Sequence, residues 1–287
     1  MIERKNFSND FFNVRLNGGF KMKMSTGLNN LAPIVITGRG GSGTRLLSRL
    51  VQQAQIFLGN KLNRQGDSLE WVKLNRKFLF EGINIKNGTF DTFAKSLLIE
   101  KSKNILSQLP ENHCYKEWGF KLPEMLFMLP ELFDTFPQAK LIHLVRHPVS
   151  TSLRRTHITS RMDNPVGQWV LPQAYRYLSL NEQLIEKYGD EINNAISWKF
   201  QLDIINKFAK KQLNENNYLV IKFEELIKNP ANVYNTTMNF IGRQFDNLDV
   251  PDILINENRA LIKNTDLKTE SKIWEICGEA AELLGYK

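Results

Sequence analysis

A glycine-rich turn between an apolar run and a leucine-rich segment most constrains the fold of this 287-residue chain. Residues 34–36 read Ile-Val-Ile, which is typical of a buried strand, and the leucines of residues 46–50 repeat at helical spacing. The turn between them, Gly38-Arg-Gly-Gly-Ser-Gly43, joins a strand to a helix N-terminus. Unpaired backbone N–H groups and the helix dipole favour an anion there, and glycines let the main chain approach it closely. The segment therefore predicts a phosphate-binding turn.

Two common phosphate-binding turns fit this segment poorly. A Walker A loop needs a lysine followed by serine or threonine after its last glycine, whereas Gly43 is followed by Thr44 and Arg45. A magnesium-dependent NTPase is therefore disfavoured. The spacing Gly38-x-Gly40-x-x-Gly43 matches the dinucleotide fingerprint, but residues 58–63 contain no clear acidic partner for a ribose. That match alone is a weak signal.

A second strand end decides between the possibilities. Residues 139–145 form an apolar strand pattern that ends at Arg146 and continues as His147-Pro-Val-Ser-Thr-Ser152. The first turn, with its Ser-Gly-Thr core at residues 42–44, resembles the 5′-phosphosulfate loop of sulfotransferases. The second segment resembles the element of that family that holds the 3′-phosphate of 3′-phosphoadenosine 5′-phosphosulfate (PAPS). The resemblance covers about residues 31–287 and implies a PAPS-dependent sulfotransferase with a P-loop-like fold.

The resemblance also implies which residues bind the nucleotide. In the turn and the first helix they are Arg39, Gly40, Gly41, Ser42, Gly43, Thr44 and Arg45. At the second strand end they are Arg146, Ser150, Ser152 and Arg154. Arg154 stands where the family usually has a serine, and the two nearby serines are close enough to substitute. Each charge-assisted contact to a phosphate contributes about 1.5–3 kcal/mol. Lys263 or Lys268, in a segment that the family folds over the nucleotide, is a further candidate.

Three residues are candidates for the chemistry. Lys121 and Pro123 resemble the Lys-x-Pro element of tyrosylprotein-type and bacterial sulfotransferases, in which the lysine contacts the transferring sulfuryl group. Such a cation stabilises the charge that develops on the departing oxygen. Gly41 replaces the cation that usually precedes Ser-Gly-Thr, so Arg39 is expected to turn back onto the phosphosulfate. Asp67 follows the first helix where tyrosylprotein sulfotransferases carry a catalytic glutamate, which makes it the expected general base.

These assignments have alternatives. Lys121 is also typical of a surface lysine before a helix, and Asp67 with Glu70 also matches a helix N-cap with a capping box. Glu70 and His143 are alternative bases, although a histidine inside an apolar strand is more often a core residue. For the whole chain, the alternatives are a noncatalytic nucleotide-binding protein of the same fold and a nucleotide kinase.

The remaining pattern predicts one α/β domain over residues 31–287 and a loosely ordered N-terminal arm over residues 1–30. Helices alternate with strands, which implies right-handed crossovers, a central parallel β-sheet flanked by helices, and ligands at the carboxyl ends of the strands. Strands are expected at 34–36, 140–145 and 218–222, and helices at 68–80, 92–109, 124–136, 173–187, 194–212 and 270–286.

Composition narrows the partners and the location. The net charge is +8, but the lysines are scattered over helical faces, so no nucleic acid is expected as a partner. Cys114 and Cys277 lack metal-ligand spacing, so neither a metal site nor a disulfide framework is expected, and a reducing, cytoplasmic location fits. No window of 18 uninterrupted apolar residues occurs, which argues against an integral membrane segment.

The acceptor is expected to be a carbohydrate, lipid or other small molecule that carries a hydroxyl or amine. Its pocket is expected from residues 56–115 and 155–190. Four aromatic residues are candidates for stacking on a sugar, although a core position is more typical of most of them: Trp71, Trp118, Trp169 and Tyr175. The oligomeric state is not indicated by the sequence.

Overall fold

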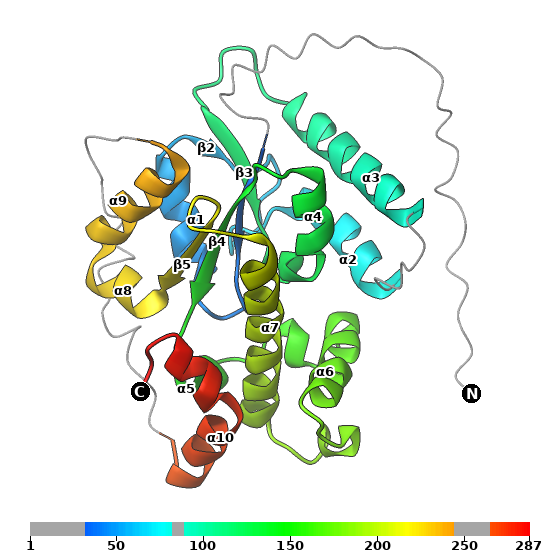
Figure 1. The fold of residues 1–287 in the computed structure, drawn as a ribbon, viewed down its shortest axis with the longest axis vertical. Coiled ribbons are helices and arrows are strands. Elements are labelled where there is room, and N and C mark those ends of the chain that lie inside the picture. The colour runs from blue at the N-terminus through cyan, green and yellow to red at the C-terminus, as the bar shows by residue number, and fades with distance from the viewer. Residues whose placement is uncertain (1–31, 82–88, 244–264) are drawn as a thin grey trace.

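The computed structural model describes residues 32–81, 89–243 and 265–287. Within them one parallel sheet has the strand order β2-β3-β1-β4-β5 and lies between layers of helices (Figure 1). Its strands are β1 (Ile34–Thr37), β2 (Ile56–Phe57), β3 (Glu117–Lys121), β4 (Lys140–Val145) and β5 (Tyr218–Lys222). The predicted α/β class and parallel sheet are confirmed. The predicted arm at residues 1–30 and Lys263 lie outside the described residues.

The two faces of β1 belong to two different cores because successive side chains of a strand point to opposite sides. Ile34 and Ile36 pack in a core with α1 (Thr44–Gln53), α8 (Phe223–Lys228) and α9 (Pro230–Ile241). Val35 packs in the opposite core, which several helices cover (Figure 1). These are α2 (Val72–Glu81), α3 (Thr89–Leu106), α4 (Leu129–Thr135), α6 (Pro165–Tyr177) and α7 (Asp190–Gln212). Burial on both faces explains why β1 reads as an uninterrupted apolar run.

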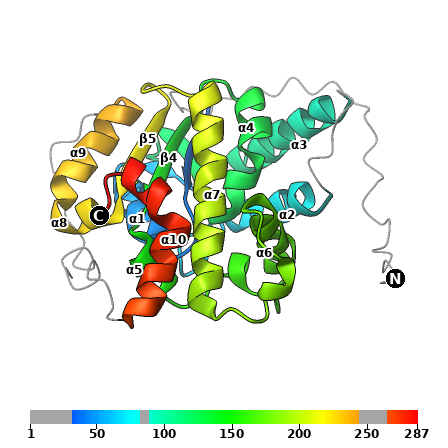
Figure 2. The same ribbon diagram turned by 60° about the horizontal axis from the view of Figure 1, so that its bottom comes forward.

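A third core fixes the segment that follows β4. It joins the short helix α5 (Pro148–Ser152) to α7 and to α10 (Leu267–Leu283), which lies along α7 (Figure 2). Trp198 of α7 is buried there, and its indole N–H donates to the backbone carbonyl of Arg146 at 3.1 Å. Packing of α7 and α10 therefore fixes the segment that begins at Arg146 and continues through α5.

One predicted helix is misplaced. The sequence indicated a helix over residues 173–187, whereas α6 spans Pro165–Tyr177. Its start has a standard signal, because the Asn164 side chain accepts from the N–H of Val166 and Pro165 occupies the first turn. The end of α6 has no such signal in the sequence. Ser179 there adopts the left-handed conformation (φ +57°) that glycine usually supplies. Residues 178–187 contain only a short 3-10 helix, Glu182–Leu184 (η4).

The elements that the sequence did not predict include β2, β3, α8 and α9. β3 contains Gly119, which normally weakens a strand. A Cβ atom on Gly119 would lie 2.0 Å from the backbone oxygen of Ile34 on the neighbouring β1. Glycine is therefore needed for the close approach of β3 to β1.

Among the described residues, every helix is too short or too polar to cross a bilayer. Cys114 is exposed and Cys277 is buried, and both are free thiols.

Candidate functional site

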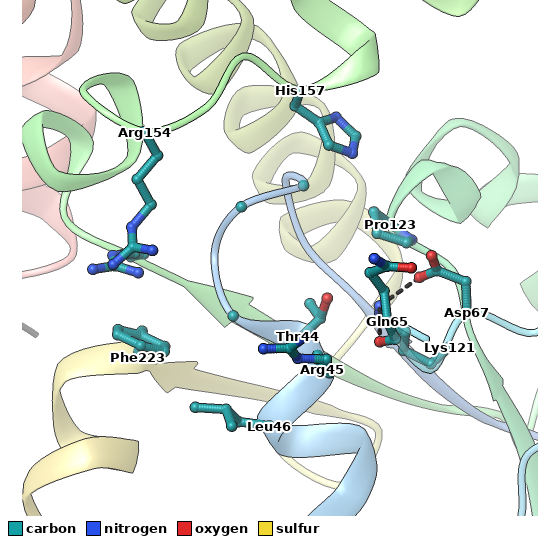
Figure 3. A pocket seen from close by; sticks show the side chains of 14 residues that line it. Thr44, Arg45, Leu46, Gln65, Asp67, Lys121, Pro123, Arg154, His157 and Phe223 are labelled. Carbon is teal, nitrogen blue, oxygen red and sulfur yellow. Dashed lines mark hydrogen bonds and ion pairs between the residues drawn. The ribbon is translucent and has the colours of Figure 1, made fainter. Parts of the chain in front are cut away.

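Four strand ends meet at one edge of the sheet. β1 leads into the glycine-rich turn and α1, β3 ends at Lys121, β4 ends just before Arg146, and β5 ends just before Phe223. A cavity of about 420 Å³ lies over the turn at this edge (Figure 3). It is lined by Gly40, Gly41, Gly43, Thr44, Arg45, Leu46, Gln65, Asp67, Lys121, Pro123, Arg146, Arg154, His157 and Phe223. The structure thus brings together residues from both motifs of the sequence.

One end of the cavity is built around Lys121. This side chain is 2% exposed, and its ammonium group donates to Asp67 Oδ1 at 2.5 Å and to the Gln65 carbonyl at 3.2 Å (Figure 3). Burial lowers the pKa of Lys121, and the neighbouring Asp67 carboxylate opposes that effect. The Lys121 ammonium group is therefore buried and fixed by hydrogen bonds. It is not the surface lysine that the sequence left as an alternative.

The loop before η1, the 3-10 helix Leu69–Trp71, positions Asp67. Asn63 organises this loop, because its Oδ1 accepts from the backbone N–H of Asp67 at 2.9 Å and its side-chain amide donates to Asp67 Oδ2 at 2.7 Å. Both carboxylate oxygens of Asp67 therefore have hydrogen-bond partners. The capping-box alternative is wrong, since Ser68 precedes the 3-10 helix and Glu70 accepts from backbone N–H groups of residues 60 and 61.

The other end of the cavity is formed by two arginines and an aromatic ring. Arg154 points into the cavity across from Lys121 and Asp67, with Phe223 nearby (Figure 3). The guanidinium carbon of Arg146 lies 4.1 Å from the centre of the Phe223 ring. Burial, together with the charge of Arg154, lowers the pKa of Arg146 to about 10, so it stays charged at neutral pH. Two cations thus face one space and repel each other.

The cavity is strongly cationic overall. Arg45, Lys121, Arg146 and Arg154 line it, against the one carboxylate of Asp67. The His157 imidazole adds no charge, because burial, with the nearby cations Arg39 and Lys121, lowers its pKa to about 3. Such a lining favours an anionic ligand with charge at both ends. Among the described residues, no group of three or more His, Cys, Asp or Glu side chains is arranged to hold a metal ion.

Several residues predicted for the cavity lie away from it. The Arg39 side chain turns into the protein, where it donates to the Gly40 carbonyl at 2.8 Å, to Ser160 Oγ at 3.1 Å and to Asn194 Oδ1 at 2.5 Å. Arg39 is 3% exposed, and burial lowers its pKa to about 9. Its guanidinium therefore ties the turn to α7 instead of facing the ligand space, contrary to the expectation from Gly41.

The other residues that were predicted to contact the nucleotide also lie outside the lining of the cavity. Ser42 is buried and its backbone N–H closes the turn onto the Arg39 carbonyl at 3.0 Å. Ser150 and Ser152 of α5 are buried, and their hydroxyl oxygens have no hydrogen-bond partner. Lys268 is exposed at the start of α10. None of these four side chains lines the cavity.

The two alternative bases have structural roles. Glu70 holds the loop at residues 60 and 61, as described above. His143 is 2% exposed inside β4, bonds the Tyr218 hydroxyl at 2.9 Å, and has its pKa lowered to about 3 by burial. The aromatic candidates are also mostly structural: Trp71, Trp118 and Tyr175 are buried in the core, and Trp169 packs edge-on against Phe127.

A second cavity of about 300 Å³ adjoins the first at its Lys121 end. Asp67, Pro123 and His157 line both cavities. The second cavity is further lined by Asn63, Leu69, Val72, Asn75, Arg76, Leu122, Glu124, Ile158 and Val166. Most of these residues fall in the two ranges expected to form the acceptor pocket, and residues 122–124 are the exception.

Comparison with known proteins identifies the family. Residues 33–247 match the sulfotransferase family. The chain belongs to this family. The sulfotransferase domain from the curacin biosynthetic pathway has a similar fold, with 17% identity, a TM-score of 0.50, and coverage of 89% of this chain and 98% of that one. A sulfotransferase from Alicyclobacillus acidocaldarius is similar in fold, with 14% identity, a TM-score of 0.51, and coverage of 89% and 96%.

A mouse sulfotransferase whose structure contains PAP is also similar, with 16% identity, a TM-score of 0.44, and coverage of 88% of this chain and 86% of that one. Comparison with curated proteins found no match. The family match over residues 33–247 confirms the predicted family, and the similar folds confirm the predicted fold.

Reasoning from the sequence missed two residues that the structure places near Lys121 and the second cavity. His157 lies against Gly40, where a Cβ atom would be 1.9 Å from its Nε2, and Glu124 faces His157 from the second cavity. Glu124 directly follows the Lys-x-Pro element, which was a usable signal. His157 had none, because it lies in an irregular stretch before the 3-10 helix Ile158–Ser160 (η3).

Proposed function

We propose that this protein transfers the sulfuryl group of PAPS to a hydroxyl or amine of a small-molecule acceptor and releases PAP. The observation that carries the proposal is one cationic cavity with Lys121 at one end and Arg154 at the other (Figure 3), where Arg146 lies against Phe223. PAPS has matching chemistry, since its phosphosulfate and its 3′-phosphate are anions at separate ends of one molecule. The glycine-rich turn lies between the two ends and offers main-chain donors.

The two arginines support a phosphate at their end of the cavity. Like charges that face one space destabilise each other, and a dianionic phosphate between them removes that repulsion. The glycine at position 41 does not leave the other end without a cation, because Arg45 lines the cavity as well as Lys121. Ser150, Ser152 and Lys268 stay predictions for the nucleotide contact.

Lys121 is proposed to act on the reacting group. The acceptor atom attacks sulfur, the bond from sulfur to the 5′-phosphate oxygen breaks, and the electron pair stays on that oxygen. A fixed ammonium group stabilises this growing charge more than it stabilises the bound substrate. Asp67 holds Lys121 at 2.5 Å and supports its charged form. The role of Asp67 as the general base stays a prediction, as does the cytoplasmic location.

A comparison of ligands tests the nucleotide. PAP should raise the melting temperature of the protein more than ATP with magnesium or NAD at equal concentration, as measured by differential scanning fluorimetry. Saturation to about 100 times Kd adds about 2.7 kcal/mol to the free energy of unfolding. Equal or larger stabilisation by ATP with magnesium would contradict the proposal and favour a nucleotide kinase.

A pair of variants tests the division between the two ends of the cavity. Arg146→Ala should weaken PAP binding by about 1.5–3 kcal/mol in isothermal titration calorimetry, the loss of one charge-assisted contact. Lys121→Ala should leave PAP affinity nearly unchanged, because PAP lacks the sulfuryl group, and should depress turnover of PAPS. Lys61→Ala, at an exposed lysine that lines neither cavity, is the control. Equal losses of PAP affinity in both variants would refute this division.

A further inference from the structure

The second cavity adjoins the place where the proposed reaction occurs. It shares Asp67, Pro123 and His157 with the nucleotide cavity, and in Figure 3 Asp67 and Pro123 lie next to Lys121, with His157 beyond Pro123. A molecule in the second cavity therefore approaches the end at which the sulfuryl group would lie, and it stays clear of Arg146 and Arg154 at the other end.

The walls of this cavity have two chemical characters. Leu69, Val72, Leu122, Ile158 and Val166 supply aliphatic surface, and Leu69 is still 43% exposed. Apart from the His157 imidazole, no aromatic ring is among the described residues that line it. Sugar rings are usually bound on aromatic faces, so aliphatic walls favour a saturated hydrocarbon part. A volume of about 300 Å³ lies at the small end for ligand sites and suits a small molecule.

A polar group of the ligand would meet Asn75. This side chain is 3% exposed, and its amide oxygen Oδ1 has no hydrogen-bond partner. A buried acceptor without a partner costs about 1–3 kcal/mol, which a donor on a bound molecule would recover. Asn75 thus selects a ligand that carries an N–H or O–H group.

Glu124 lines the second cavity, directly after the shared residue Pro123. Its side chain is largely buried at the start of η2, the 3-10 helix Pro123–Met128, and its Oε1 lies 3.6 Å from His157 Nε2, which is longer than a hydrogen bond. The backbone N–H of Thr159 donates to His157 Nδ1, so the proton of the neutral imidazole resides on Nε2 and faces Glu124. Asp67, in contrast, has both oxygens bound, to Lys121 and Asn63.

The protonation of Glu124 fits a base that works near neutral pH. Burial is the main cause that raises the pKa of Glu124 to about 7, and the charge of Asp67 adds to this effect. The backbone N–H of Glu124 and the charges of Lys121 and Arg76 act in the opposite direction. A base with this pKa is half ionised at neutral pH and retains enough basicity to accept a proton. The charged and titratable groups that surround it are Asp67, Lys121, Arg76 and His157.

We infer that the second cavity binds the acceptor, that the acceptor is a small aliphatic alcohol or amine, and that Glu124 takes its proton. The inference rests on the proposed function. In the step, a bond forms between the acceptor oxygen or nitrogen and sulfur, and the bond from sulfur to the 5′-phosphate oxygen breaks with its electrons. The acceptor proton passes to the Glu124 carboxylate, so the products are the sulfated acceptor and PAP.

The test measures PAP formed from PAPS with four probe acceptors: cyclohexanol, hexanol, hexylamine and glucose. The first three should increase PAP formation, and glucose should not, because it has no aliphatic part for the apolar walls. Leu69→Trp and Ile158→Phe, which fill the cavity, should abolish the increase and leave the Kd for PAP within about twofold. Leu267→Trp, at a leucine that is 84% exposed on α10, is the matched control and should change neither quantity.

The proton acceptor is tested by Glu124→Gln. Turnover should fall by about 10²–10⁴-fold, the range for loss of a positioned base, and its rise with pH near 7 should disappear. Asp67→Asn should keep that rise, because its effect passes through Lys121.

The outcomes separate this inference from the proposed function. If PAP binds but no probe increases turnover, or if turnover survives the filling variants, the cavity assignment is wrong. If the rise with pH persists in Glu124→Gln and disappears in Asp67→Asn, the base is Asp67. Failure of PAP to bind at all would instead refute the proposed function.

Discussion

The buried carboxyl group of Glu124 makes a prediction about stability that needs no substrate. In the folded protein its pKa is raised from the ordinary 4.5 to about 7, chiefly by burial. Between these two pH values the unfolded chain has lost the proton while the folded protein retains it. The stabilisation from the protonated group is therefore complete below pH 4.5 and is lost as the pH rises through 7. The change in pKa corresponds to about 3 kcal/mol.

Glu124→Gln replaces the carboxyl group with a neutral amide of the same shape. Relative to the wild type, the free energy of unfolding of this variant should rise by up to about 3 kcal/mol between pH 4.5 and pH 8. Urea unfolding at several pH values measures it, and other titrating groups cancel in the difference. Glu100→Gln, at an exposed position of α3, is the matched control for the exchange of a glutamate for glutamine.

If the difference for Glu124→Gln stays constant within about 0.5 kcal/mol over this pH range, the reasoning is refuted. This threshold is the size of effect that surface substitutions commonly have. A constant difference would mean that the carboxyl group is hydrated or paired in the folded protein. A difference of the opposite sign would mean that the charged form is the stabilised one.

Further predictions concern two glycines and one histidine of the core. Gly119→Ala should destabilise the protein by about 2–4 kcal/mol in urea unfolding, because its Cβ would lie 2.0 Å from the backbone oxygen of Ile34. Gly278→Ala, in the middle of α10 with its nearest neighbour at 3.4 Å, should instead stabilise by about 0.5–1 kcal/mol, and equal effects would contradict the argument. Burial lowers the pKa of His143 from 6.5 to about 3, so its contribution to stability is lost as the pH falls below 6.5. His143→Gln should reduce this loss by about 1.4 kcal/mol per pH unit, and an unchanged pH dependence would count against it.

The two motif turns could be read from the sequence because each is local. The strand, the glycines and the helix of the first turn are contiguous, and so are β4, Arg146 and α5, so spacing alone placed them at strand ends. The direction of a side chain is not local. Arg39 is inside the turn, but Ser160 and Asn194, more than 100 residues away, determine where its guanidinium points.

The second cavity was less predictable for the same reason. Its walls come from the loop at residues 63–69, from α2, from η2 and from residues 157–166, and among these only the start of η2 carries a recognisable motif, the Lys-x-Pro element at Pro123. Glu124 and Asn75 gain their properties from burial, which depends on the packing of all four. The sequence indicated the ranges that contribute, and the contacts between them required the fold.

The two cavities share only three lining residues. This separation has a consequence for the evolution of acceptor specificity. The first cavity, where the nucleotide is proposed to bind, is built from strand termini and one glycine turn, and a substitution there disturbs the sheet. Val72 of α2, Ile158 of η3 and Val166 of α6 line the second cavity only, and the two cavities share no lining residue other than Asp67, Pro123 and His157. Exchanges at Val72, Ile158 and Val166 would therefore reshape the accepted molecule while the donor stays the same. A combinatorial library at these three positions, screened with a single sulfuryl donor, would sample new acceptors without loss of the cofactor.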